Sequence, residues 1–400
     1  MPFVDLDTLS EDERAVRDTA RRFATDVMRP VGAALDRLPD PDQVIAKGSP
    51  LWGVFDQYRR LDLDVLDSME GDLSMLQRAR MRFLVSEQLG WGDAGLAISL
   101  GVSTFPRYFA QMSGRPALME RFGAAGSKEI GCWAITEPDH GSDQLTMTES
   151  HFANASIRAN CTARLEGNEY VINGQKAAWV SNGTIATVAA LFCTVDPSQG
   201  LRGGGVCLVP LGGPGVTRGR PLDKLGQRAL NQGEIFFDNV RIPAEYMIVG
   251  PEMYGTVVEM VLALANASMG AIFCGLARAA VEHAIAYAKQ RVQGGVPIFE
   301  HQSVRGRLFQ AFTQAEAARS LAWRVLLHNS VNPPLVQYSI ASKVFCTTTA
   351  FEAASTALQI FGGNGLSREY PIEKVLRDAR ASMIEDGCNE VLSLVGGSKL

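Results

Sequence analysis

Residues 133–143 read WAITEPDHGSD, and this stretch decides how the rest of the chain is interpreted. An apolar run leads directly into a Thr-Glu-Pro turn, and a Gly-Ser pair follows shortly after it. Where a strand ends in such a turn, backbone N–H groups and hydroxyls can bind the flat, polar edge of a cofactor. The stretch therefore predicts a ligand-binding turn at the end of a strand.

Three further segments line up behind this stretch. They are GQKAAWVSNG at 174–183, DKLGQRALNQGEIFFDNVRIP at 223–243 and QIFGGNGLSREYPIEKVLRDAR at 359–380. Together the four segments resemble those of the acyl-CoA dehydrogenase superfamily of flavoproteins, and the resemblance covers nearly the whole chain. It implies an α+β fold in which an N-terminal helical domain, a middle antiparallel β domain and a C-terminal four-helix bundle follow one another.

The composition is that of an ordinary soluble protein. With 400 residues, 46% of them hydrophobic, the chain can bury a large core in more than one structural unit. A net charge of -5 without Lys/Arg-rich runs argues against nucleic acid and membranes as partners. The seven cysteines lack C-x-x-C spacing, so we expect no metal site and no disulfide framework. The acidic N-terminus and the lack of a long uncharged apolar run predict a cytoplasmic protein.

Hydrophobic periodicity indicates helices in the first block and strands in the second. Residues 1–127 read as helical, with a first helix that starts at Ser10, whose spacing to Glu13 is that of a capping box. Residues 128–245 read as short strands separated by turn dipeptides such as Asn173-Gly174.

The third block, residues 246–400, returns to long amphipathic segments separated by prolines. These segments span about 252–293, 299–331, 335–361 and 371–395. Four such helices favour an antiparallel bundle. The resemblance implies that FAD lies between this bundle and the β domain.

A flavin needs hydrogen bonds at its pyrimidine edge and N5, and its pyrophosphate needs neutralisation, because the redox chemistry itself belongs to the cofactor. By resemblance, the ring would be lined by Trp133, Ile135, Thr136 and Trp179, with the Ser181 hydroxyl near N5 and Ser142 toward the phosphates. Taken singly, these residues also fit a plain strand exit and a core aromatic. Their order along the chain favours the flavin.

The second motif departs from the family pattern. The family usually has one residue between the Lys and the Trp, whereas Ala177 and Ala178 both follow Lys176 here. We expect the extra residue to form a β-bulge.

The resemblance assigns other residues to the adenosine half of FAD. Arg291 opens a segment whose family counterpart grips the diphosphate with a guanidinium, although Gly294 stands where the family usually has Phe. Gln302 and the run Gln359, Ile360, Gly362 and Gly363 match adenosine-binding segments, the latter from a neighbouring subunit, and the two glycines also read as a helix C-cap. Cofactor sharing of this kind implies an oligomer, typically a homotetramer built as a dimer of dimers.

The segment IEDGCNE at 384–390 holds the candidate base. Most family members read Tyr-Glu-Gly-Thr here, and that Glu removes the proton α to a thioester while the β-carbon gives hydride to flavin N5. Counting on from Arg377 places Asp386 at the position of the Glu and Glu385 at that of the Tyr. Burial raises a carboxylate's pKa, as a base for a weak C–H acid requires, although Asp is one methylene shorter. Cys388 and Glu390 complete the segment on the cofactor side.

Several interpretations stay open at this position. In the first, Asp386 is the base of a dehydrogenase whose substrate has an unusual α-carbon. In the second, Asp386 takes a proton from a different C–H acid, as in nitroalkane oxidases. In the others, Glu385 is the base, or Asp386 only caps a turn before Gly387. A family subgroup carries its base on the first helix of the bundle, but Ala265 occupies that position here.

The residues that hold acyl-CoA in the family are altered in this chain. Asn266 stands where many members have an Arg that helps hold acyl-CoA, and Ala263 replaces a commonly acidic neighbour. With Ser142 and Gly387, Asn266 is a predicted substrate contact. The acyl group is therefore bound as a CoA thioester held by other residues, it arrives on an acyl carrier protein, or the substrate has no such arm. His140 either lines the pocket entrance or is a solvated loop residue.

We therefore expect an FAD-dependent acyl-CoA dehydrogenase that passes electrons to an electron-transfer flavoprotein or a similar acceptor. The alternative is a flavin oxidase or monooxygenase on the same fold, similar to nitroalkane oxidase. A non-enzymatic relative would show a basic surface and no carboxylate at position 386, and the sequence has neither feature.

Overall fold

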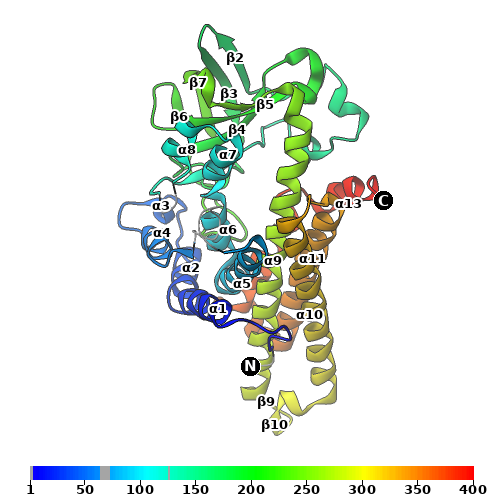
Figure 1. Cartoon of the computed structure of the whole chain (residues 1–400). Helices are drawn as coiled ribbons and strands as arrows, with labels where there is room; N and C mark the ends of the chain where they lie inside the picture. Colours follow the sequence, from blue (N-terminus) through cyan, green and yellow to red (C-terminus); the bar gives the residue numbers. More distant parts are fainter. Residues whose placement is uncertain (1–2, 64–72, 125–126) are drawn as a thin grey trace.

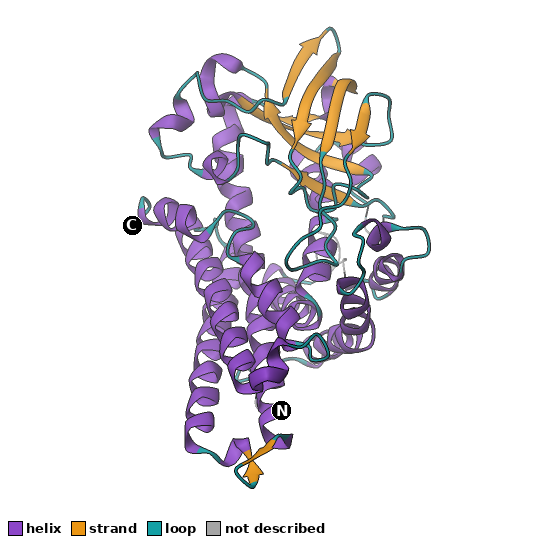
Figure 2. Ribbon diagram, turned by 180° about the vertical axis from the view of Figure 1, so that it is seen from behind, coloured by secondary structure: helices purple, strands orange, loops and turns teal. Residues whose placement is uncertain are grey.

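The computed structural model describes residues 3–63, 73–124 and 127–400. A β-sheet lies at one end of the molecule, and long helices run away from it toward the opposite end (Figure 1). The view from behind shows helices beneath the sheet and the C-terminus beside the bundle (Figure 2). The polypeptide thus has the α+β architecture that the motifs implied.

The N-terminal region is helical. Its α-helices are α1 (Glu11–Phe23), α2 (Arg29–Asp36), α3 (Asp42–Ile45), α4 (Pro50–Arg60), α5 (Met75–Gly92), α6 (Ala94–Val102), α7 (Phe105–Ser113) and α8 (Pro116–Phe122). The predicted capping box is present, because the Ser10 hydroxyl accepts from the N–H of Glu13 at 3.1 Å and the Glu13 carboxylate accepts from the N–H of Ser10 at 2.8 Å. Part of the predicted helical block, residues 64–72, lies outside the described residues.

The middle region is one eight-stranded sheet with the order β6-β7-β3-β2-β4-β5-β8, with β1 paired to β4. The strands are β1 (Gly131–Ala134), β2 (Thr162–Glu166), β3 (Glu169–Lys176), β4 (Val188–Thr194), β5 (Gly204–Pro210), β6 (Val216–Arg218), β7 (Ile235–Pro243) and β8 (Met247–Val249). The expectation of a purely antiparallel sheet is wrong, since β1 and β2 both pair with β4 in parallel. The sheet is mixed, and β8 extends it past residue 245.

The turn predicted at Asn173-Gly174 is a bulge inside a continuous strand. The register of β3 against β7 shifts between Ile172 and Gly174, and Gly174 has φ of 133°. A Cβ at Gly174 would lie 2.6 Å from the Cα of Cys161, so the neighbouring chain passes too close for a side chain. The bulge that was expected after Lys176 is absent, because β3 ends at that residue.

The C-terminal region begins with α9 (Pro251–Gln290), which a short hairpin of β9 (Val292–Gln293) and β10 (Val296–Pro297) follows. The remaining helices are α10 (Gln302–Val331), α11 (Val336–Phe361), α12 (Ile372–Ser382) and α13 (Asn389–Gly397). Helices α9, α10 and α11 pack together, and α5 packs against α9 and α10 (Figure 1). Among the described helices, α9 is long and apolar enough to cross a membrane by composition, but 83% of its most apolar window is buried inside the protein.

The predicted fourth helix over 371–395 is two helices. Between α12 and α13 the chain makes a turn in which Asp386 has φ of 52° and Gly387 has φ of 91°. Both values lie in the left-handed region, which ends a right-handed helix. The break places residues 385–388 in a connection rather than on a helix face.

Candidate active site

The turn at residues 385–388 is held by a different part of the protein at each position. The side-chain amide of Gln227 donates to Glu385 Oε1 at 2.6 Å, and Asn266 Nδ2 of α9 donates to the carbonyl of Asp386 at 3.3 Å. Lys343 Nζ of α11 donates to the carbonyl of Gly387 at 2.8 Å. The fourth contact comes from the N–H of Cys388.

That N–H donates to the hydroxyl of Ser142 at 3.0 Å. Ser142 belongs to the WAITEPDHGSD stretch, so one hydrogen bond joins the segment that resembles a flavin-binding motif to the turn that carries the candidate base. Ser142, Asn266, Gly387, Cys388, Glu385 and Asp386 therefore lie together. Glu390, by contrast, is exposed in the first turn of α13.

The Asp386 carboxylate makes no hydrogen bond among the described residues, although its main chain is fixed. Burial raises its pKa to about 6, and the nearby Lys343 ammonium opposes that rise. A half-buried carboxylate with this pKa and no hydrogen-bond donor among the described residues can accept a proton near neutral pH. The same observation disfavours a role in which Asp386 only caps the turn.

The neighbouring Glu385 also has a raised pKa, but its carboxylate accepts a hydrogen bond. Burial and the Asp386 carboxylate raise its pKa to about 7, and the hydrogen bond from Gln227 opposes this effect. Its oxygen is thus already occupied by a donor from the 223–243 segment.

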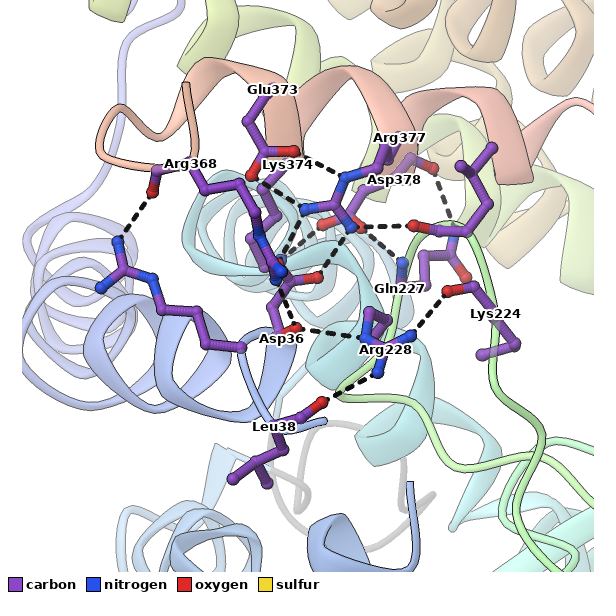
Figure 3. Close-up of polar contacts among 12 residues, drawn as sticks. Asp36, Leu38, Lys224, Gln227, Arg228, Arg368, Glu373, Lys374, Arg377 and Asp378 are labelled. Atoms are coloured by element: carbon purple, nitrogen blue, oxygen red, sulfur yellow. Dashed lines mark hydrogen bonds and ion pairs between the residues drawn. The ribbon is translucent and has the colours of Figure 1, made fainter. Parts of the chain in front are cut away.

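A buried charge network anchors this segment to α12 (Figure 3). Arg377 donates to both oxygens of Asp36 at 2.9 and 2.7 Å and to the carbonyl of Leu225 at 2.8 Å. A Cβ at Gly226 would lie 2.3 Å from the main-chain oxygen of Arg377, so this close approach requires glycine. Gln227 then donates from its backbone to Asp378 and from its side chain to Glu385. The base-bearing turn is thereby connected to α2 through α12.

Glu137 of the Thr-Glu-Pro turn is a structural residue. Its carboxylate pairs with Lys176 Nζ at 2.6 Å, and both side chains are fully buried. It also accepts from the N–H of Cys161 at 3.1 Å. The pair fixes the end of β3 against the turn that follows β1.

The predicted ring-lining residues lie on two connected segments. The N–H of Ala177 donates to the carbonyl of Thr136 at 2.9 Å, which joins the first motif to the second. Trp133 and Ile135 are buried, whereas Trp179 is 58% exposed. Gln232 Nε2 donates to Ser181 Oγ at 3.1 Å.

Two observations fit a flavin at this place. The indole N–H of Trp133 is buried without a partner among the described residues, and a buried donor of this kind is costly. A half-exposed tryptophan at position 179 offers a flat apolar surface that a ring can cover. The donor set therefore suits a planar, polar-edged cofactor.

The residues assigned to the adenosine half lie elsewhere. Exposed positions at the far end of the bundle include Arg291, Gln302, Gln359, Gly362 and Gly363, whereas Ile360 is buried. Near them Tyr287 stacks on Phe361 with ring centroids 4.0 Å apart, and Gly362 caps α11 as predicted.

The two groups are far apart within one chain. From Asn266, beside Asp386, to the end of α9 the helix advances by roughly 36 Å at 1.5 Å per residue. The structure thus separates the predicted site residues into a group near Asp386 and a group at the other end of α9 (Figure 1).

Sequence reasoning missed Gln227, Lys224 and Lys343. Lys224 Nζ donates to the carbonyl of Leu230 and to Gln232 Oε1, both at 2.7 Å, and burial lowers its pKa to about 8. Lys343 was detectable as a lone cation on the buried face of an apolar helix. His140, which had two open interpretations, contacts Asp143 Oδ2 at 2.7 Å.

A cavity of about 460 Å³ lies on the face of α9 that leads toward Asn266. Thr256, Glu259 and Ala263 line it from this helix, together with Met147 and Pro334. Ala263 is one helical turn before Asn266 and therefore faces the same side. The lining contains the Glu259 carboxylate and neither Arg nor Lys.

A mixed sheet between helical regions, with a half-buried carboxylate in the turn after α12, is the arrangement expected of an acyl-CoA dehydrogenase-type oxidoreductase. Residues 132–240 match the acyl-CoA dehydrogenase middle domain, and residues 255–399 match the acyl-CoA dehydrogenase C-terminal domain. The chain belongs to the acyl-CoA dehydrogenase family of flavoproteins.

Individual relatives agree with this assignment. The chain is 30% identical to the mitochondrial short-chain specific acyl-CoA dehydrogenase of Rattus norvegicus, over 97% of this chain and 89% of that protein. Butyryl-CoA dehydrogenase from Megasphaera elsdenii is similar in structure, with a TM-score of 0.85, 27% identity and 99% of both chains covered. An active-site mutant of nitroalkane oxidase shares the fold, with a TM-score of 0.85 at 21% identity over 99% of this chain and 96% of that one.

Proposed function

We propose that this protein is an FAD-dependent acyl-thioester dehydrogenase in which Asp386 removes the α-proton of the substrate. The observation that carries the proposal is the Asp386 carboxylate, which accepts no hydrogen bond from any described residue. Its turn is held by Gln227, Asn266, Lys343 and Ser142. A base fixed by its main chain and free at its carboxylate is positioned without being neutralised.

FAD, when bound, supplies a hydride acceptor for the β-carbon. The chain's contribution is to hold it: Trp133, Ile135, Thr136, Trp179 and Ser181 would support the ring. Ser142 would contact both substrate and cofactor, because its hydroxyl lies at the turn that carries Asp386.

The carbonyl of the substrate needs donors as negative charge develops on its oxygen. The main-chain N–H of Asp386 makes no hydrogen bond among the described residues and is therefore available for this purpose. A carbonyl bound there would present its α-carbon to the adjacent Asp386 carboxylate.

The separation of the two residue groups supports an oligomer. Arg291, Gln302, Gln359 and Gly363 are too far from Asp386 along α9 to share one cofactor with it in the same chain. A second copy would bring its own group to this site, as the homotetramer implied by the family would require.

The route for the thioester arm is the cavity beside α9. Its lining lacks Arg and Lys, and the Glu259 carboxylate in it pairs with Lys399 Nζ at 2.8 Å. Because Asn266 also replaces the usual arginine, we infer that the arm segment nearest Asp386 is held mainly by apolar and neutral polar groups. A pantetheine arm on CoA or on a carrier protein has this chemistry. Electrons would leave through an electron-transfer flavoprotein or a similar acceptor in the cytoplasm.

The test is an anaerobic titration of the FAD-loaded protein with straight, branched and cyclic acyl-CoAs and the matching acyl-pantetheines. Loss of the flavin absorption band with at least one thioester supports the proposal. Preference for acyl-pantetheine over acyl-CoA would point to a carrier protein as the donor of the arm.

The second candidate is an oxidase similar to nitroalkane oxidase, and the Asp at the base position together with Asn266 favours it. It predicts flavin bleaching by a primary nitroalkane and fast reoxidation with peroxide release in air-saturated buffer. A dehydrogenase is expected to reoxidise slowly.

A further inference from the structure

Lys343 is a buried cation whose role none of the motifs explains. It lies in the N-terminal third of α11, and its side chain is fully buried. The same helix face carries the buried residues Ser339, Ser342 and Cys346. A lysine is almost never placed this way unless its ammonium has a defined partner.

Its hydrogen-bond partners are neutral and belong to the Asp386 turn. Nζ donates to the carbonyl of Gly387 and to Asn389 Oδ1, both at 2.8 Å. Asn389 uses its own Nδ2 to donate to Thr347 at 3.0 Å, which fixes the oxygen of the carboxamide toward Lys343. The ammonium thus clamps the turn on both sides of Cys388.

No described carboxylate lies within ion-pair distance of Nζ, so its charge is balanced at longer range. Burial lowers the pKa of Lys343 to about 8, and the Asp386 carboxylate is the strongest influence in the opposite direction. Glu385, the Cys388 thiol and Glu390 act in the same sense more weakly.

The other elements packed against the turn add few charges. Helix α9 contributes the neutral Asn266, and the WAITEPDHGSD stretch contributes the neutral Ser142 hydroxyl. Lys224, from the 223–243 segment, acts on Glu385. Among the described residues, Lys343 is therefore the cation that acts on the Asp386 carboxyl.

We propose that Lys343 is a positioning residue that fixes the turn through Gly387 and Asn389 and holds the Asp386 carboxyl in its ionised, proton-accepting form. Its effect on catalysis rests on the proposed function, but its effect on Asp386 does not. An opposite charge about 4–6 Å away, beyond a direct ion pair, still lowers a carboxyl pKa by about 1–3 units. Removing the ammonium leaves burial unopposed, so Asp386 becomes protonated at higher pH.

The test is a pH titration of the carboxylic-acid band of Asp386 by infrared difference spectroscopy on the FAD-loaded protein. The band is assigned by ¹³C-aspartate labelling and by its loss in Asp386→Asn. No substrate is needed. The parent is expected to titrate near pH 6, the value to which burial raises this pKa.

In Lys343→Met the midpoint is expected to rise by at least about one pH unit, which is a tenfold change in the ionisation equilibrium. Lys343→Arg, which keeps the charge, should remain close to the parent. Lys47→Met removes an exposed lysine and should also leave the midpoint unchanged. Lys343→Gln removes the charge but retains a donor, and it replaces Lys343→Met if methionine prevents folding.

A folded Lys343→Met or Lys343→Gln protein with the parental midpoint overturns the proposal, because the ammonium would then not act on Asp386. A shifted midpoint sustains it. If the shift occurs but no acyl thioester bleaches the flavin, the role of Lys343 stands and the proposed function fails.

Discussion

Gln227 Nε2 donates to Glu385 Oε1 at 2.6 Å, and the same Gln227 donates from its backbone to Asp378. Of the two adjacent carboxylates in the turn, Glu385 is therefore tied to the 223–243 segment, whereas Asp386 has its main chain fixed and its carboxylate free. This difference separates the two candidates for the base.

Replacing Asp386 by Asn is expected to leave FAD binding intact and to slow flavin reduction by substrate by about 10²–10⁴-fold, the usual contribution of a general base. Glu385→Gln, which keeps an acceptor oxygen for Gln227, should retain a rate within about tenfold of the parent. Rapid-mixing measurements of flavin bleaching distinguish the two variants. The reverse ranking would move the base to Glu385.

The rate of flavin reduction should depend on the ionisation of Asp386. Burial raises its pKa from 3.8 to about 6, so the carboxylate is mostly ionised above pH 6 and the rate should fall as the pH drops below that value. A carboxyl group whose pKa is higher in the folded than in the unfolded protein also makes the folded protein less stable as the pH rises toward the folded-state pKa. The parent should therefore lose stability relative to Asp386→Asn between about pH 4 and pH 6, as measured by unfolding midpoints. A flat difference across this range contradicts the assignment.

The buried pair of Glu137 and Lys176 should dominate the stability of the motif region. Glu137→Gln leaves an unpaired buried ammonium, so a loss of about 3–5 kcal/mol in the free energy of unfolding is expected. The matched control is Glu169→Gln, because Glu169 pairs with Arg241 at the surface and such pairs contribute about 0–1 kcal/mol. Denaturant unfolding of the two variants gives the comparison, and equal losses would show that the buried pair is not needed.

The bulge at Gly174 gives a second stability test. Alanine there combines φ of 133° with a Cβ 2.6 Å from the Cα of Cys161, so we expect a loss of more than about 2 kcal/mol. Gly101→Ala in α6 is the control, since nothing lies within 4 Å of its Cβ position and alanine favours helix by about 0.5–1 kcal/mol. Thermal unfolding should thus shift in opposite directions, and a Gly174→Ala protein as stable as the parent would contradict the bulge geometry.

Local signals in the sequence identified local structure. The capping box at Ser10 and the C-cap at Gly362 were predictable because each depends on residues a few positions apart. The parallel pairing of β1 with β4 was not, since period-2 patterns carry no information about strand direction. Asn173-Gly174 read as a turn because the same dipeptide suits a hairpin and a bulge.

Tertiary contacts account for the remaining differences. Lys176 and Lys343 are both fully buried, and only the fold shows which distant groups their ammonium groups contact. The break between α12 and α13 was hidden because a single glycine is tolerated in a helical pattern. Asn266, Lys343 and Ser142 hydrogen-bond the main chain of this turn, and these three residues are distant from it in sequence.

The separation of the two residue groups predicts that the cofactor site is shared between copies of the chain. Arg291→Ala damages the group at the far end of α9, and Asp386→Asn damages the group at the turn, so each variant alone should be inactive in flavin reduction. When the two are dissociated together and reassociated, activity should return to about one site in four, because half of the dimers are mixed and each has one intact site. Active-site titration of the mixture measures this fraction, with each variant treated alone as the control. If no activity returns although light scattering shows mixed oligomers, Arg291 and Asp386 do not act on the same cofactor across the interface.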